Sequence, residues 1–182
     1  MKDIYQECPV YKSELVTLRQ TNIEDVEDLL KCYSDEKTVP FFNSDNCHGD
    51  DFHYMTLDRM RQAIDFWDYS YKKKYFVRWT VIYNDTKEKI GTIEMFHRVS
   101  DDDFNDYGVL RIDLQSKYEV QPVIDNILEI AIVNFYTAFN VDVIITKAIP
   151  EAFHRVSSLL KYGFKPLNKK FMIYDNYFII NK

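Results

Sequence analysis

Residues 108–164 read GVLRIDLQSKYEVQPVIDNILEIAIVNFYTAFNVDVIITKAIPEAFHRVSSLLKYGF, and this stretch decides the fold. Its pattern predicts a strand, a polar loop, an amphipathic helix, a nearly continuous apolar strand and a short second helix. The long helix therefore begins directly after a strand that ends in a polar loop. Backbone amides at such a helix start lack internal partners and carry partial positive charge, so this end can bind an anion.

The composition is that of one soluble domain, predicted over residues 1–182. Hydrophobic side chains make up 46% and charged ones 29%, which is ordinary for a globular protein. The net charge of −6 argues against general nucleic-acid binding. The 14 Tyr, 13 Phe and 2 Trp predict well-filled sheet faces, and an aromatic-lined pocket or dimer surface is the alternative.

The cysteines and the apolar runs indicate where in the cell the protein is expected. Cys8, Cys32 and Cys47 contain no CxxC pair, so we expect reduced thiols, no metal site and a cytoplasmic protein. No run approaches the roughly 18 apolar residues of a membrane span, and the N-terminus has no apolar leader core. We therefore expect no membrane association.

The rest of the chain predicts an α+β domain. Thr21 to Glu24 is a capping box that opens a first helix, and Gly91 inside a strand indicates a bulge or a close backbone approach. A hairpin across Asp175-Asn176 is predicted to close the chain. The predicted strands are 14–19, 76–83, 89–98, 107–114, 141–148, 171–174 and 177–180, and the earlier helices end near 33 and 71.

Three short sequences along this order carry a family resemblance. They are Leu18-Arg19 before an Asn-x-x-Asp helix start, Lys89-Ile90-Gly91-Thr92-Ile93, and the ending Leu159-Leu160-Lys161-Tyr162-Gly163-Phe164. With this order and spacing, the chain resembles the GCN5-related N-acetyltransferases (GNAT), nearest to the ribosomal-protein N-acetyltransferase branch, from about Leu15 to Ile180. The resemblance implies the acyl-CoA N-acyltransferase fold, a mixed, mostly antiparallel sheet of about seven strands flanked by about four helices.

The resemblance also implies where acetyl-CoA binds. In the family a loop of pattern Gln/Arg-x-x-Gly-x-Gly/Ala holds the diphosphate at the start of the long helix. Here Glu119 is acidic, Pro122 has no N–H and Ile124 is branched, and a helix start without a ligand is the alternative. The implied cofactor-binding residues are Ile112, Asp113, Leu114, Lys117, Glu119, Val120, Gln121, Pro122, Val123, Ile124, Ala152 and Arg155.

Acetyl transfer needs a neutral amine, an acceptor for its proton and a donor for the developing oxyanion. The resemblance implies a backbone amide within residues 112–114 as that donor. Glu94 and Asp106 fit the role of base by position, and Ser157 lies near the place of the family's acid. Leu159 occupies the place where relatives carry a tyrosine, and it cannot donate a proton.

We therefore expect an N-acetyltransferase that moves an acetyl group from acetyl-CoA to a primary amine of a protein or a small molecule, without a metal. The alternative is a non-catalytic GNAT-fold binding or regulatory module that has lost efficient CoA binding. The aromatic C-terminal hairpin has an edge compatible with a homodimer in either case.

Overall fold

The computed structural model describes residues 3–182. Its strands form one eight-stranded sheet. The strands are β1 (Tyr11–Lys12), β2 (Val16–Gln20), β3 (Val77–Tyr83), β4 (Lys89–Arg98), β5 (Tyr107–Leu114), β6 (Val143–Lys147), β7 (Lys165–Pro166) and β8 (Tyr177–Asn181). The helices are α1 (Val26–Tyr33), α2 (Leu57–Lys72), α3 (Gln121–Phe139) and α4 (Phe153–Lys161), with short 3₁₀ turns at Ile23–Asp25, Val39–Phe41 and Ser116–Tyr118.

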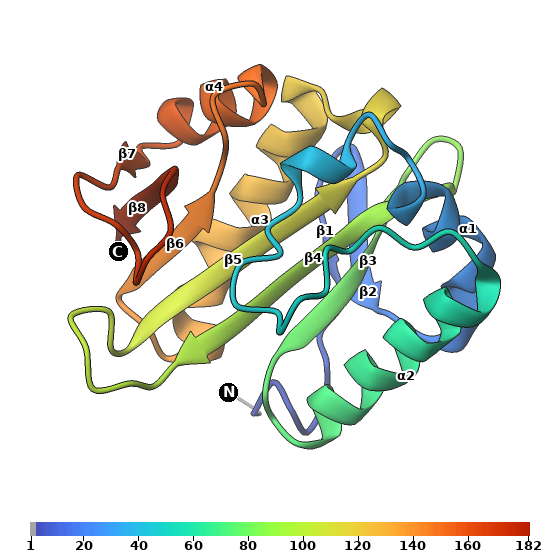
Figure 1. Ribbon diagram of the computed structural model, residues 1–182, viewed down its shortest axis with the longest axis horizontal. Coiled ribbons are helices and arrows are strands. Elements are labelled where there is room, and N and C mark those ends of the chain that lie inside the picture. The colour runs from blue at the N-terminus through green and yellow to red at the C-terminus, as the bar shows by residue number, and fades with distance from the viewer. Residues whose placement is uncertain (1–2) are drawn as a thin grey trace.

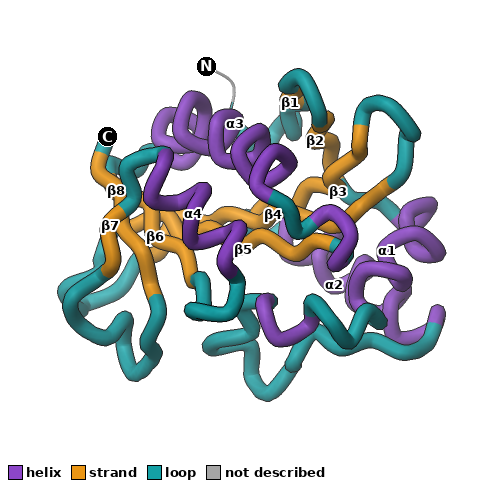
Figure 2. The backbone as a smooth tube through the Cα atoms, turned by 90° about the horizontal axis from the view of Figure 1, so that it is seen from above, coloured by secondary structure: helices purple, strands orange, loops and turns teal. Residues whose placement is uncertain are grey.

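The sheet is mixed and mostly antiparallel, which confirms the predicted fold class. Its order is β1-β2-β3-β4-β5-β6-β8-β7, and only β5 and β6 are parallel. It has one strand more than predicted, because the two-residue edge strands β1 and β7 were not predicted and the predicted strand 171–174 is absent. Helices α1 and α2 lie on one face and α3 and α4 on the other (Figure 1; Figure 2).

The helix α3 supplies most of the core on its face. Its apolar stripe packs with side chains of β2 to β6, and Trp79 of β3 stacks on Phe135 at a ring distance of 5.0 Å. By length and composition α3 could cross a membrane, but half of the relevant stretch is buried inside the protein. The core helix of a soluble protein passes the same test, so this is weak evidence for a span.

The capping box at the first helix lies one residue later than predicted. The Asn22 side chain accepts from the Glu24 amide (2.9 Å), and Asp25 accepts from the Asn22 amide (3.1 Å). The prediction of Thr21 and Glu24 was wrong because Thr21 still belongs to the sheet layer. Its amide donates to the carbonyl of Arg78 (3.1 Å), and its side chain is buried.

The bulge predicted at Gly91 is confirmed. The pairing register between β3 and β4 shifts between Val81 and Ile82, opposite this glycine. A Cβ at Gly91 would lie 1.9 Å from the carbonyl oxygen of Asp113 on β5. The two backbones therefore approach more closely than any other residue type allows.

The prediction of a closing hairpin across Asp175-Asn176 was wrong. Strand β8 pairs with β6 along Val143–Lys147 and with β7 at Lys165 and Pro166, while Phe171 and Tyr174 form only an isolated bridge. Both sides of β8 are thus used inside the sheet. The outer strand is β7, and its proline limits backbone pairing there.

The feature that positions the site is the parallel pair of β5 and β6. The two strands pair from Tyr107 with Val143 to Leu110 with Thr146. Strand β5 then continues to Leu114 while the chain after β6 turns away through Ala148 toward α4. The strands therefore diverge beside the start of α3, where the polar loop of residues 115–120 connects β5 to that helix (Figure 1).

Candidate functional site

A cavity of about 210 Å³ lies at the diverging ends of β5 and β6. We call it the opening; it is lined by Phe41, Ser116, Glu119, Glu151, Ala152, Phe153 and His154. Two of the predicted cofactor residues, Glu119 and Ala152, are therefore brought together here. The volume is below the roughly 300–1,000 Å³ of usual small-molecule sites.

A buried ion pair limits the size of the opening. Arg155 donates from Nε and Nη2 to the two carboxylate oxygens of Glu119, at 2.8 and 2.7 Å. Its Nη1 donates to the carbonyl oxygen of Phe41 at 2.9 Å. The two side chains are only 2% and 5% exposed. A diphosphate would meet a carboxylate here, and the neighbouring guanidinium is already engaged, so the residues as arranged do not fit the diphosphate of acetyl-CoA.

The start of α3 offers little else to an anion. Pro122 removes one first-turn amide, and no side chain caps the helix at Val120. The side chains of Val123 and Ile124 are buried in the core, so they are not loop positions facing a ligand. Lys117 pairs with Glu88 (Nζ to Oε1, 2.6 Å) and is more than half exposed.

The backbone of β5 remains available on the side from which β6 has diverged. The amide of Gln115, just after β5, donates to the Ile90 carbonyl of β4 at 2.8 Å. Successive residues of a strand turn their amides to opposite sides. The amides of Ile112 and Leu114 are therefore directed toward the diverging side, where no β6 residue pairs with them. These are the positions predicted to supply an oxyanion donor.

The helix α4 turns Ser158, and not Ser157, toward the start of α3. Ser158 is buried, and its hydroxyl donates to the Gln121 carbonyl at 3.5 Å. Ser157, the candidate acid from the sequence, is exposed. Leu159 is fully buried in the core.

Glu94 lies at the centre of a row of charges across three strands. Arg78, Glu94 and Arg111 are direct cross-strand neighbours on β3, β4 and β5. Arg78 donates from Nε (3.0 Å) and Nη2 to Glu94 Oε2, and Arg111 donates from Nη1 to Oε1 at 2.7 Å. Burial alone would raise the pKa of Glu94, but the two guanidinium groups outweigh it and lower the pKa. Both oxygens are occupied, which disfavours Glu94 as a base.

Asp113 closes the same network from within the core. It accepts from the hydroxyl of Tyr33 (2.8 Å) and from Arg78 Nη1 (3.1 Å). Tyr33 also shares a hydrogen bond of 2.7 Å with Thr92. Among residues 3–182 the Oδ1 atom of Asp113 finds no hydrogen-bond partner, and burial raises the pKa of this carboxyl. Its side chain therefore stabilises the network and does not face the opening.

A cavity of about 560 Å³ lies over this row of charges, between α2, residues 46–54 and the sheet. We call it the aromatic pocket. Its walls include Phe52, Tyr54, Phe66, Trp67 and Phe96, and its floor is Arg78, Glu94 and Arg111. Of this floor, Glu94 was predicted from the sequence as a base, whereas Arg78 and Arg111 were not predicted as site residues. The available signal was an arginine inside a strand of largely apolar residues.

One chain segment, residues 41–47, joins the opening to the aromatic pocket. Its Phe41 carbonyl binds Arg155, as described above. Asp45 pairs with Lys147 at 2.7 and 2.8 Å, and its carbonyl accepts from Arg111 at 3.1 Å. Cys47 lines the aromatic pocket, and burial raises the pKa of its thiol. This segment lies after α1 and before α2 in the chain, and in Figure 1 it crosses in front of β5 and β4.

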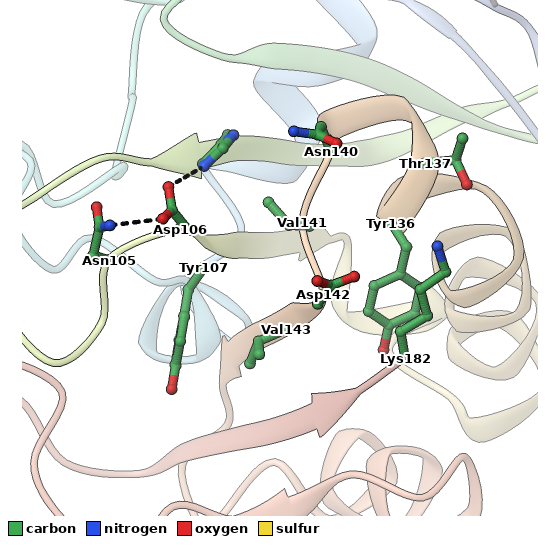
Figure 3. A pocket seen from close by; sticks show the side chains of 11 residues that line it. Asn105, Asp106, Tyr107, Tyr136, Thr137, Asn140, Val141, Asp142, Val143 and Lys182 are labelled. Atoms are coloured by element: carbon green, nitrogen blue, oxygen red, sulfur yellow. Dashed lines mark hydrogen bonds and ion pairs between the residues drawn. The ribbon is translucent and has the colours of Figure 1, made fainter.

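Asp106 lies at the other end of the sheet. Figure 3 shows it in a cavity of about 500 Å³, with Asn105, Asn140 and Asp142. Its Oδ1 is 3.0 Å from His97 Nε2, and its Oδ2 accepts from Asn105 at 2.7 Å. The eight residues of β5, at roughly 3.3 Å per residue, separate Asp106 from the opening by about 25 Å. This distance is too long for the role of base predicted for Asp106.

Comparisons with known proteins agree with the fold. The model of the family described as "Acetyltransferase (GNAT) domain" matches residues 16–165. The uncharacterized N-acetyltransferase YoaA of Bacillus subtilis (strain 168) is 26% identical over 92 residues, covering 50% of this chain and 48% of that protein. The match therefore spans about half the length of this curated relative.

Solved structures resemble the chain over nearly its whole length. The ribosomal-protein-S5-alanine acetyltransferase from Vibrio fischeri has a TM-score of 0.71 at 16% identity and covers 96% of both chains. Mycobacterium smegmatis RimJ, in complex with CoA-disulfide, has a TM-score of 0.73 at 11% identity, covering 91% of this chain and 81% of its own. At such identities the likeness concerns the fold alone.

Proposed function

Because the chain belongs to the acetyltransferase (GNAT) domain family, we propose that it moves an acetyl group from acetyl-CoA to a primary amine of a protein or a small molecule. The observation that carries the proposal is the divergence of β5 and β6 beside the start of α3. It leaves an unpaired strand edge next to a helix N-terminus, and such an edge can bind a ligand through backbone groups.

The chain's own residues support two roles in this reaction. The amides of Ile112 and Leu114 face the diverging side and are the proposed donors for the oxyanion. His154 lines the opening, and imidazole is a common proton acceptor near neutral pH. We propose His154 as the base, since Glu94 is held by two arginines and Asp106 lies at the far end of β5. Acetyl-CoA, when bound, supplies the activated thioester.

Binding of the coenzyme requires one rearrangement. The buried pair with Arg155 holds the Glu119 carboxylate at the wall of the opening, so we propose that the two side chains separate before a diphosphate enters. Ala152 and the backbone of residues 112–114 are the predicted cofactor residues that can keep their places during this change.

The experiment is a transfer assay that measures CoA thiol release from acetyl-CoA. The acceptors are a peptide beginning with Ser, a peptide beginning with Ala, and a set of small amines. We expect release that depends on the acceptor, and about 100-fold slower turnover in His154→Gln. The matched control is His97→Gln, which changes the imidazole in the Figure 3 cavity and should keep native turnover. Acceptor-independent release, or equal loss in both variants, would contradict the proposal.

A second candidate is a non-catalytic binding or regulatory module with this fold. The observation that favours it is the buried Glu119–Arg155 pair in the place where the coenzyme would lie. Titration of the native protein with CoA separates the two functions. A ligand at 100 times its Kd stabilises a protein by about 2.7 kcal/mol, so an unchanged melting temperature at millimolar CoA supports the module.

A further inference from the structure

The aromatic pocket has the size and the walls of a small-molecule site. Its volume of about 560 Å³ lies within the usual range of such sites. Phe66 and Trp67 approach from α2, Phe52 and Tyr54 from the preceding loop, and Phe96 from β4. Flat apolar walls of this kind favour a ligand with an aromatic ring.

Each carboxylate oxygen that lines the pocket already accepts at least one hydrogen bond from the protein. Both oxygens of Glu94 accept from Arg78 or Arg111. Asp50 accepts from the Phe52 amide on Oδ1 (2.9 Å), and from Tyr54 (2.9 Å) and Arg59 (2.6 Å) on Oδ2. An ammonium group entering the pocket would therefore find no unpaired carboxylate.

Donors, in contrast, remain available. The Nε of Arg111 is buried and has no hydrogen-bond partner among residues 3–182. Arg59 bonds to Asp50 through Nη2, while its guanidinium carbon lies 4.3 Å from the Tyr54 ring centre. The lining contains three guanidinium groups and two carboxylates, and Asp113 behind the lining also pairs with Arg78. The preference for a ligand therefore depends on the unpartnered donor of Arg111 and not on a net charge. A buried donor without a partner is costly, so an acceptor-bearing ligand is favoured.

We propose that the aromatic pocket binds a small molecule that carries both an aromatic ring and a carboxylate. The ring packs between the aromatic walls, and the carboxylate is held by Arg111 and Arg59. That this molecule is the acetyl acceptor, through an amine elsewhere on it, rests on the proposed function. The binding itself does not, because it needs no coenzyme.

The test uses phenylacetate as the probe and two matched compounds, 2-phenylethylamine and acetate. The first control keeps the ring and replaces the anion by a cation, and the second keeps the anion and removes the ring. Binding is followed by calorimetry and by the fluorescence of Trp67, with Trp67→Phe to identify the signal. We expect phenylacetate to bind at least tenfold more tightly than either control. Equal or tighter binding of 2-phenylethylamine, or no binding of phenylacetate at millimolar concentration, would overturn the proposal.

Three arginine variants locate the carboxylate. Arg111→Gln should weaken phenylacetate binding about 10- to 100-fold, the equivalent of one lost charge-assisted hydrogen bond. Arg59→Gln, at a more exposed position that does not hold the buried network, should weaken it about threefold to tenfold and keeps the test valid should Arg111→Gln not fold. Arg61→Gln, also on α2 but outside the pocket lining, should leave binding unchanged. Equal effects of Arg59→Gln and Arg61→Gln would overturn the assignment. Failure of the transfer assay with intact phenylacetate binding would refute the proposed function alone.

Discussion

The substitution Glu119→Gln tests most directly whether the buried Glu119–Arg155 pair blocks the coenzyme. The carboxylate accepts two hydrogen bonds from Arg155, at 2.8 and 2.7 Å, and both side chains are almost completely buried. Removing one partner of a buried pair costs about 3–5 kcal/mol. Glutamine keeps one acceptor oxygen, so we expect the unfolding free energy to fall by about 3 kcal/mol in urea unfolding followed by tryptophan fluorescence.

The same change should improve the binding of CoA. Arg155 keeps its bond to the Phe41 carbonyl but loses one of its two bonds to residue 119 and the charge of that partner. A guanidinium donor beside the start of α3 then becomes available to a phosphate. One charge-assisted hydrogen bond contributes about 1.5–3 kcal/mol, so calorimetry should show CoA binding about 10- to 100-fold more tightly than in the native protein. The native state of the variant should also regain stability when CoA is added.

Glu151→Gln is the matched control. Glu151 lines the same opening but is exposed, so its replacement removes the same charge without freeing Arg155. We expect native stability and at most about a threefold change in CoA affinity. Equal gains in CoA affinity for the two variants would show that net charge, and not the release of Arg155, governs binding. No gain in either would refute the reasoning.

Three further predictions concern the start of α3, the buried carboxylate of Asp25 and the close approach of β4 and β5 at Gly91. Pro122→Ala restores one first-turn amide and should raise CoA affinity less than about tenfold by calorimetry; a loss of affinity would contradict this. Burial alone would raise the pKa of Asp25, but hydrogen bonds from Arg19 and Thr80 lower it, so its stabilisation is present above about pH 4 and is lost as the pH falls. Asp25→Asn should therefore cost about 3 kcal/mol at pH 7, with a difference that shrinks below about pH 4; a constant difference would be evidence against this linkage. Gly91→Ala should lower the free energy of unfolding in urea by about 3 kcal/mol or more, because the new Cβ would lie 1.9 Å from a backbone oxygen of β5. A near-native unfolding midpoint would show that the two strands move apart to accommodate it.

Local sequence patterns predicted the elements whose structure depends mainly on their own residues and adjacent turns. The bounds of β4 and β5 were predicted to the residue, because apolar and β-branched side chains end at polar turns on both sides. The bulge at Gly91 also followed from its place inside a strand. The C-terminal hairpin failed because β8 has two other partners, and one of them, β6, is more than 25 residues earlier in the chain.

The candidate site could be predicted only in part, because its contacts also join residues that are distant in the chain. The resemblance placed Glu119, Ala152 and Arg155 near one another, and they do lie at the opening. That Glu119 binds Arg155 depends on a contact 36 residues apart. The aromatic pocket depends on the register of three strands, which sets Arg78 beside Glu94 and Glu94 beside Arg111. No local pattern specifies such a register without the turns and the buried faces of all three strands.

The most direct measurement is an amide NMR titration of the native protein with acetyl-CoA. We expect concentration-dependent shifts that cluster at residues 111–124 and 151–155, around the diverging ends of β5 and β6. Shifts confined to the cavity of Figure 3, or no shifts at millimolar acetyl-CoA, would contradict binding of the coenzyme at these ends.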